Sequence, residues 1–265
     1  MALFKKDWNK PGPGVPKDAP PKKGLARFWE ILVRDGGNLL KLNLLVQLCY
    51  LPSQIFLLLA VLSLAYLQGQ GMLLAGILAF LCSVPVGPAR CAESYVVSKM
   101  LRDDPGFVWH DFKKAFKENF KASVFPCMLF SLVTGIQVLA FLYYQMLGGV
   151  SIFTLIGLFL SVLLFAIVVP YYFLQAVYVD LKFFPLLKNS MLLALGNAPR
   201  SLAGGILALV LVGLQWFVFP FAFVFTLIWG YTLPTLINLM WIWPVFDKTF
   251  TIDATLKERA AAKLE

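Results

Sequence analysis

The sequence predicts an all-α integral membrane protein with six transmembrane helices arranged as three hairpins. Three observations predict this class: 60% of the residues are hydrophobic, only 14% are charged, and three long stretches, 42–89, 122–179 and 201–246, contain no charged residue and no histidine. Each stretch is roughly twice the ~20 residues that a helix needs to cross a bilayer's hydrocarbon core. Each can therefore cross the membrane, turn and return.

Helices are expected in these stretches rather than the strands of a β-barrel. Lipid offers the backbone no hydrogen-bonding water, so only helices and closed barrels span membranes. The apolar runs are continuous, whereas barrel strands alternate apolar with polar residues. The expected spans are about 43–67, 72–97, 122–145, 150–178, 202–220 and 224–246.

The expected domain organisation is one membrane unit between two cytoplasmic tails. Residues 1–25 are rich in proline and lysine, a composition that neither nucleates a helix nor buries a core. Residues 26–247 form the six-helix membrane domain, and 248–265 form the C-terminal tail. No cleavable signal peptide is expected, because the first ~40 residues lack an early apolar core.

The distribution of Lys and Arg predicts that both termini are cytoplasmic. The chain carries 23 Lys and Arg against 14 Asp and Glu, and none of the basic residues lies in the expected hairpin turns near 68–71, 146–150 and 219–223. Excess Lys and Arg near short loops marks the cytoplasmic side. The net charge of +9 is therefore assigned to contacts with anionic lipid headgroups and not to nucleic acid.

A cytoplasmic interfacial amphipathic helix is expected before each hairpin, within 26–41, 109–120 and 184–200. Gly36 and Gly37 are expected to separate the first of these helices from its span. The elbow residues between each helix and its span are Asn38, Lys41, Asn119, Lys121, Asn197 and Arg200. Their recurrence every ~80 residues suggests a threefold repeat. Alternatively, any amphipathic helix that meets a span needs a polar, basic corner.

The only charged residues inside an expected span are Arg90 and Glu93. They are three positions apart, so they share a helix face and can form an ion pair. An ionisable pair at membrane depth is a candidate functional site, and nearby prolines would interrupt the helix as in transporter binding sites. The candidate polar site comprises Pro85, Gly87, Pro88, Arg90, Glu93 and Tyr95. The structural alternative is that Arg90 reaches the cytoplasmic interface with Glu93 as its local partner.

Prolines also occur in the second helix of the other two expected hairpins, at Pro170 and Pro234. Three kinked helices would either surround a central cavity or supply the curvature that a bundle needs for packing. Uncharged polar residues in the spans are expected to form hydrogen bonds between helices, with a cavity for a polyhydroxylated solute as the alternative.

No catalytic, cofactor or metal site is expected. His110 is the only histidine, the four cysteines lack metal-ligand spacing, and no nucleotide-binding or hydrolase motif is present. An enzyme would have few groups to work with, so it is the least favoured class.

Several short segments carry a resemblance to a known family. They are 9–15, 40–45, 86–89 with Tyr95 and Lys99, 102–104, 111–117, 186–190 and 196–200. In these segments the chain resembles the YesL-like family of bacterial membrane proteins, which is defined by the domain of unknown function 624. The resemblance extends over nearly the whole chain.

The resemblance implies a cellular neighbourhood and no catalytic residue. Proteins of this family resemble accessory membrane proteins of carbohydrate utilisation in Gram-positive bacteria, often beside sugar ABC transporters. We therefore expect a non-enzymatic accessory subunit of the bacterial plasma membrane, whose elbows and basic N-terminus contact ABC transporter subunits. The alternative is a stand-alone small-solute transporter or channel. Its path would pass Arg90 and Glu93 and be lined by the proline-kinked second, fourth and sixth helices.

Overall fold

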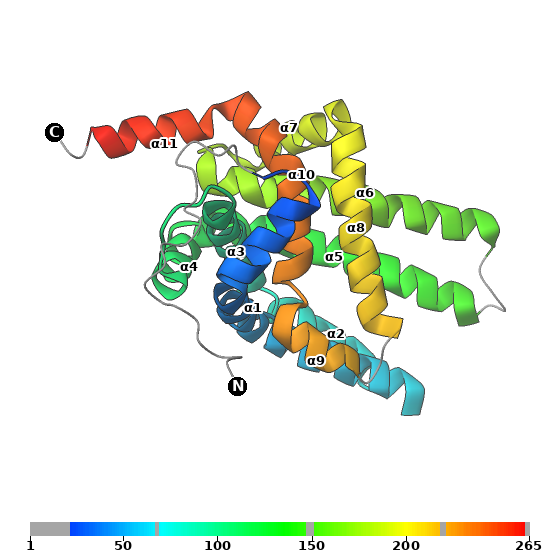
Figure 1. Ribbon diagram of the computed structural model, residues 1–265. Coiled ribbons are helices and arrows are strands. Elements are labelled where there is room, and N and C mark those ends of the chain that lie inside the picture. Colours follow the sequence, from blue (N-terminus) through cyan, green and yellow to red (C-terminus); the bar gives the residue numbers. More distant parts are fainter. Residues whose placement is uncertain (1–21, 67–68, 147–150, 218–220, 263–265) are drawn as a thin grey trace, which may run out of the picture.

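The computed structural model describes residues 22–66, 69–146, 151–217 and 221–262, and this part of the chain is helical without strands (Figure 1). Its helices are α1 (Leu25–Tyr66), α2 (Met72–Leu81), α3 (Val86–Leu101), α4 (Val108–Glu118), α5 (Phe120–Met146), α6 (Ile152–Tyr178), α7 (Phe183–Gly196), α8 (Ala198–Phe217), α9 (Phe221–Trp229), α10 (Thr232–Phe250) and α11 (Ile252–Ala261).

Three to five segments are long and apolar enough to cross a membrane. Three are single helices: Leu25–Ser63 in α1, Phe120–Gln137 in α5, and Ile152–Tyr178, which is α6. Two bent pairs qualify if each counts as one span, α2 with α3 at 45° and α7 with α8 at 98°. The all-α class with membrane-type helices is therefore confirmed. The six-span hairpin layout and the threefold repeat are not.

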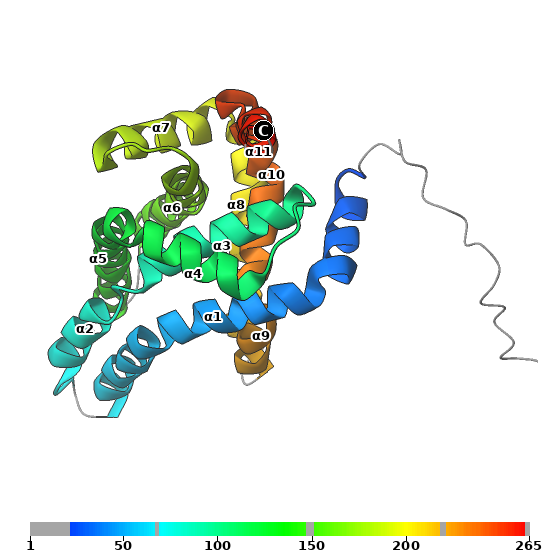
Figure 2. The ribbon, with the colours of Figure 1, turned by 90° about the vertical axis from the view of Figure 1, so that its left-hand side faces the viewer.

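The first helix is longer than expected. Gly36 and Gly37 do not interrupt it, because α1 continues through both of them and changes direction in its N-terminal part (Figure 2). A glycine costs a helix only about 1 kcal/mol relative to alanine. Burial of Ile31 and Leu39 on either side of the glycines, at 0% and 1% exposure, holds both parts of α1 against the core.

The last expected span also differs from expectation. Residues 224–246 are divided between α9 and α10, with the break at Gly230 and Tyr231. The tail at 248–265 contains the end of α10 and all of α11.

Some expected segments lie outside the described residues. These are 1–21 of the N-terminal tail, 67–68 and 147–150 in the first two hairpin turns, 218–220 in the third, and 263–265 at the C-terminus.

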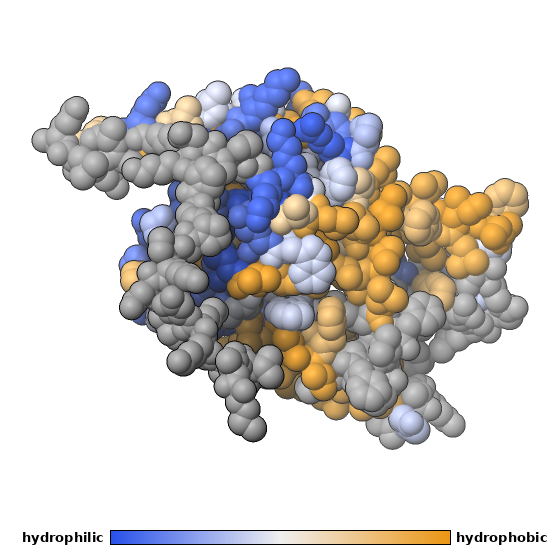
Figure 3. Space-filling view, viewed as in Figure 1, coloured by the Kyte–Doolittle hydropathy of each residue, from blue (hydrophilic) through white to orange (hydrophobic). Residues whose placement is uncertain are grey.

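Polar and apolar residues are segregated on the surface. Figure 3 shows hydrophilic residues toward the upper left and hydrophobic residues on the right, where α5, α6 and α8 lie. The main core contains fully buried residues of α1, α6 and α10, including Leu42, Tyr171, Leu236 and Phe246. Helix α3 is the element that the core surrounds most completely, since most of its residues are buried.

The interruption between α2 and α3 lies at 82–85. Pro85 directly precedes α3 and Pro88 is its third residue. Proline is tolerated in the first turn of a helix, because the N–H groups there have no intrahelical acceptor. The two prolines therefore begin a new helix after the break and do not kink a continuous one.

Gly87 lets α3 approach α5 closely. A Cβ atom at Gly87 would lie 2.4 Å from the backbone oxygen of Ser123 and 2.7 Å from Cβ of Cys127. Small residues are enriched where membrane helices cross, since they let the backbones come together. The glycine in the candidate site thus has a packing role.

Substituting Gly87→Ala should destabilise the protein by about 1–3 kcal/mol, because the added methyl group must push α3 away from α5. Gly76→Ala in α2 is the matched control, since nothing lies within 4 Å of a Cβ there. Thermal unfolding in detergent measures both variants. Equal melting temperatures for the two would contradict the packing role.

Candidate functional site

Arg90 connects three helices. Its Nε donates to Oη of Tyr50 on α1 at 2.5 Å. Its Nη1 donates to Oε2 of Glu93 on α3 at 3.0 Å and to Oγ1 of Thr235 on α10 at 3.3 Å. The guanidinium group is therefore bound by α1, α10 and its own helix.

Two aromatic rings also face the guanidinium group. Its central carbon lies 5.3 Å from the ring centroid of Tyr50 and 5.8 Å from that of Tyr231. The two rings stack on each other at 4.6 Å, and the hydroxyl of Tyr231 accepts a hydrogen bond from Gln54 Nε2. A cation over an aromatic face gains about 2 kcal/mol when desolvated. The positive charge is thus stabilised by one carboxylate and two rings.

Glu93 is more deeply buried than Arg90. The Glu93 side chain is 0% exposed, whereas that of Arg90 is 32% exposed. Oε1 of Glu93 has no hydrogen-bond partner among the described residues, and the same holds for Oε1 of Gln47 on α1. A buried acceptor without a partner carries a desolvation cost of about 1–3 kcal/mol. The ion pair is balanced in charge but has one open acceptor oxygen.

Asn43 on α1 satisfies the backbone at the break between α9 and α10. Its Nδ2 donates to the carbonyl oxygens of Thr226 and Leu227 at 2.9 and 2.8 Å. Its Oδ1 accepts from the N–H groups of Tyr231 and Thr232 at 2.9 and 3.2 Å. Helix ends leave many backbone groups without intrahelical partners, and an apolar environment supplies none. The carbonyl of Thr226 also accepts from the N–H of Gly230 at 3.1 Å. One fully buried amide therefore joins both ends of the interrupted helix.

The helices that follow the two breaks, α3 and α10, each have a proline in their first turn. Pro88 is the third residue of α3, and Pro234 is the third residue of α10. By contrast, Pro170 lies within α6 without interrupting it. Pro52 in α1 and Pro126 in α5 show that proline is not confined to the second helices of the expected hairpins.

The structure brings together only part of the candidate site predicted from the sequence. Pro85, Gly87 and Pro88 form the start of α3, and Arg90 and Glu93 form the ion pair. Tyr95 instead lies near Lys99 and near the ring of Tyr178, at 5.8 and 6.2 Å.

Sequence reasoning missed the contributions of α1 and α10. The missed residues are Tyr50, Tyr231 and Thr235, whereas Asn43 was among the polar residues expected to form hydrogen bonds between helices. A signal was present in α1, where Asn43, Gln47, Tyr50 and Gln54 are spaced by four, three and four residues and so share one helix face. No spacing pattern of this kind indicated that Tyr231 and Thr235 would contact Arg90.

The same pattern of hydrogen bonds occurs at two of the three expected elbows. Nδ2 of Asn119 donates to the carbonyl of Ala115, and the Ser123 hydroxyl donates to the carbonyl of Asn119. Asn197 and Ser201 make the equivalent bonds, with Leu193 as the acceptor of the asparagine. Each asparagine thereby ends one helix while the next begins. Asn38 differs, because it lies inside α1 and contacts Asp35 at 3.5 Å.

The basic residues of the elbows, Lys41, Lys121 and Arg200, are all exposed. Among the described residues, no group of three or more His, Cys, Asp or Glu side chains could hold a metal ion.

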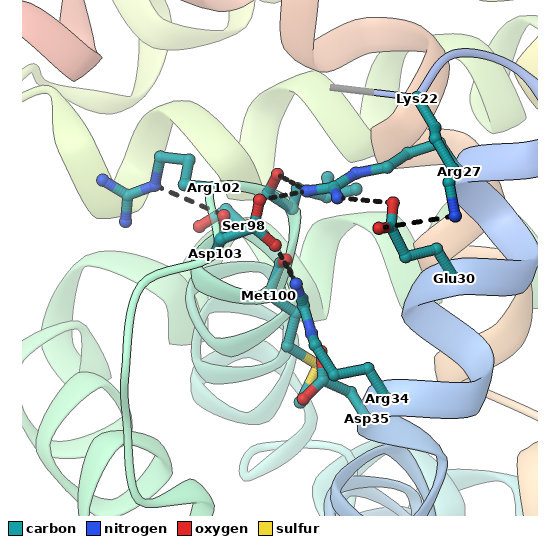
Figure 4. Close-up of polar contacts among 10 residues, drawn as sticks. Lys22, Arg27, Glu30, Arg34, Asp35, Ser98, Met100, Arg102 and Asp103 are labelled. Carbon is teal, nitrogen blue, oxygen red and sulfur yellow. Dashed lines mark hydrogen bonds and ion pairs between the residues drawn. The ribbon is translucent and has the colours of Figure 1, made fainter. Parts of the chain in front are cut away.

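A network of charged residues fixes the N-terminal part of α1 to the end of α3 (Figure 4). Arg27 binds Asp103 at 2.7 Å and the carbonyl of Leu101 at 2.9 Å. Arg34 also binds Asp103, and it donates to the carbonyl of Met100 at 2.7 Å. The last carbonyls of a helix lack intrahelical donors and carry partial negative charge, so two arginines complement them well.

Residues 54–143 match the model of a family described as "Protein of unknown function, DUF624". This segment, which is about a third of the chain, is similar to the DUF624 family. The expected resemblance to the YesL-like family is thereby confirmed over residues 54–143. The DUF624 segment contains Arg90 and Glu93 but not Tyr50, Tyr231 or Thr235. Neither a curated protein nor a solved structure matches the chain.

Substituting Asn43→Leu should destabilise the protein by roughly 2–3 kcal/mol, since four hydrogen bonds are lost at about 0.6 kcal/mol each in a membrane protein. Asn43→Asp should not restore stability, because a carboxylate cannot donate to the carbonyls of Thr226 and Leu227. Gln137→Leu is the control, since the Gln137 amide donates one bond, to Ser161 at 2.8 Å. Unfolding in detergent provides the comparison, and an equal loss for Asn43→Leu and Gln137→Leu would refute the capping role.

Proposed function

We propose that this protein is a non-enzymatic accessory subunit of the bacterial plasma membrane, with both termini cytoplasmic. The observation that supports this proposal is the set of partners of Arg90. Its donors bind Tyr50, Glu93 and Thr235 of the same chain, so the central charge joins helices. A membrane unit braced in this way can present its charged end to another protein.

The charged end exposes large aromatic side chains. Trp29 on α1, Phe107 before α4 and Trp109 on α4 are 59%, 83% and 63% exposed. Trp and Phe are enriched in protein interfaces, where a few such residues supply most of the binding energy. We assign these residues to contact with a partner, and the family resemblance favours subunits of a sugar ABC transporter as that partner.

Sugar ABC transporter subunits should co-purify with the tagged protein after extraction in mild detergent. Phe107→Ala and Trp109→Ala should each lower the amount recovered by about fivefold or more, as for interface residues worth at least ~1 kcal/mol. Phe153→Ala is the matched control. Phe153 is 82% exposed and lies at the other end of the molecule, where α6 begins (Figure 1).

Two outcomes would contradict the accessory proposal. One is the absence of transporter subunits from the wild-type purification. The other is an equal loss with Phe153→Ala, which would indicate a general effect of removing exposed aromatic residues.

A stand-alone transporter or channel is the second candidate, favoured by the open Oε1 of buried Glu93 beside two interrupted helices. Interrupted helices with an ionisable residue are a common construction for solute sites near the bilayer midplane. The path would then follow the helices around Arg90, which are α1, α3 and α10. Among the described residues, helix α6, which corresponds to the expected fourth span, contributes no hydrogen-bond or aromatic partner of Arg90.

Reconstitution in liposomes separates the two candidates. If the protein is an accessory subunit, the purified protein alone should give no flux of labelled sugars. The transporter candidate expects flux that Glu93→Gln abolishes and that Glu30→Gln preserves, because Glu30 is in a surface ion pair with Arg27. Flux that survives Glu93→Gln would exclude the Arg90–Glu93 path.

A further inference from the structure

A pocket of about 670 Å³ lies where α4 meets α5 and where α6 is followed by α7. Figure 2 shows α5, α6 and α7 on the same side of the molecule. The volume falls in the range of sites that hold small molecules. The pocket is separate from the Arg90–Glu93 site, since it shares no residue with it.

The inner part of the pocket is apolar and firmly packed. The rings of Phe125 and Phe183 meet edge to face at 5.3 Å, and the ring of Tyr172 lies 5.9 Å from that of Phe183. Tyr172 and Leu186 are only 1% and 2% exposed and belong to the second hydrophobic cluster of the protein. These walls offer an apolar surface between two candidate membrane spans, α5 and α6.

Two acidic and two basic residues line the mouth of the same pocket, namely Glu118, Lys121, Asp180 and Lys182. All four are exposed, and none forms an ion pair with another described residue. Their charges are therefore available to a ligand, and they sum to zero.

The backbone adds donors at this mouth. Helix α7 begins at Phe183, directly after Lys182, and no side chain caps its N-terminus. The first N–H groups of a helix lack intrahelical acceptors and favour an anion such as phosphate. A phosphate here would sit beside Lys121 and Lys182.

We propose that this pocket binds a phospholipid with a phosphoethanolamine headgroup. The phosphate binds Lys121, Lys182 and the start of α7. The primary ammonium donates hydrogen bonds to the carboxylates of Glu118 and Asp180. The glycerol and the upper part of the acyl chains pack against the aromatic walls.

The charge pattern selects this headgroup over the other common ones. A purely anionic headgroup would meet two carboxylates without a cation to offer them. A quaternary choline ammonium has no N–H to donate to those carboxylates. The site thus differs from the general attraction of a basic surface for anionic lipids, which requires no acidic residues.

Native mass spectrometry of the full-length protein in detergent, with defined lipids added, tests the proposal. Wild type should retain phosphatidylethanolamine in preference to phosphatidylglycerol and phosphatidylcholine. Lys121→Gln with Lys182→Gln should weaken this binding roughly fivefold for each lysine removed. Glu118→Gln with Asp180→Asn should instead shift the preference to phosphatidylglycerol, because only the two lysines then remain.

Three controls keep the outcome decisive. Lys113→Gln with Lys114→Gln removes two exposed lysines of α4 outside the pocket and should leave the lipid preference unchanged. Ala176→Trp fills the pocket and should reduce retention of all three lipids. Soluble glycerophosphoethanolamine should not compete, because it lacks the acyl chains.

The proposal is overturned if wild type retains the three lipids equally or prefers phosphatidylglycerol. It is also overturned if the Lys113 and Lys114 variant loses as much binding as the pocket variant, or if the soluble headgroup competes as well as the lipid. Except for Ala176→Trp, each variant should have a melting temperature close to that of wild type, because it replaces only exposed side chains.

Discussion

The structure depends on a constraint that every polar group within an apolar interior must meet: its partners have to come from the chain itself. Among the described helices, interruptions lie before α3 and between α9 and α10. At the second break, Asn43 hydrogen-bonds four backbone groups, namely the carbonyls of Thr226 and Leu227 and the N–H groups of Tyr231 and Thr232. Beside it, the charge of Arg90 is matched by Glu93 and by the rings of Tyr50 and Tyr231. Helix α1 supplies Asn43 and Tyr50, so it holds both interrupted segments in place.

Helix α3 extends this arrangement to the charged end of the molecule. It begins beside Arg90's partners and ends where Arg27 and Arg34 of α1 bind its last carbonyls and Asp103. Most of its residues are buried, and Gly87 brings it against α5. Helix α3 is therefore bound to α1 near both of its ends. This gives the membrane unit a rigid central element between the polar cluster and the charged surface.

The sequence alone was sufficient for the class of protein, because charge-free stretches and apolar runs are local properties. It also located the break before α3, since proline and glycine act on their immediate neighbours. The continuity of α1 through Gly36 and Gly37 was not predictable in this way, because contacts distant in sequence override a weak local preference. The split between α9 and α10 was missed for a related reason. The side chain that makes it tolerable, Asn43, lies more than 180 residues away in the chain.

Prediction of the candidate site was limited in the same way: contacts within one helix were predictable, and contacts between helices were not. The pairing of Arg90 with Glu93 follows from their spacing on one helix and was predictable. The partners Tyr50, Tyr231 and Thr235 come from other helices, and only the packing of α1, α3 and α10 brings them together. The DUF624 match ends before Tyr231 and begins after Asn43 and Tyr50. The cluster around Arg90 therefore extends beyond the segment that the family model matches. A fragment cut to residues 54–143 would keep the buried carboxylate and its arginine but lose the helices that shield them from lipid.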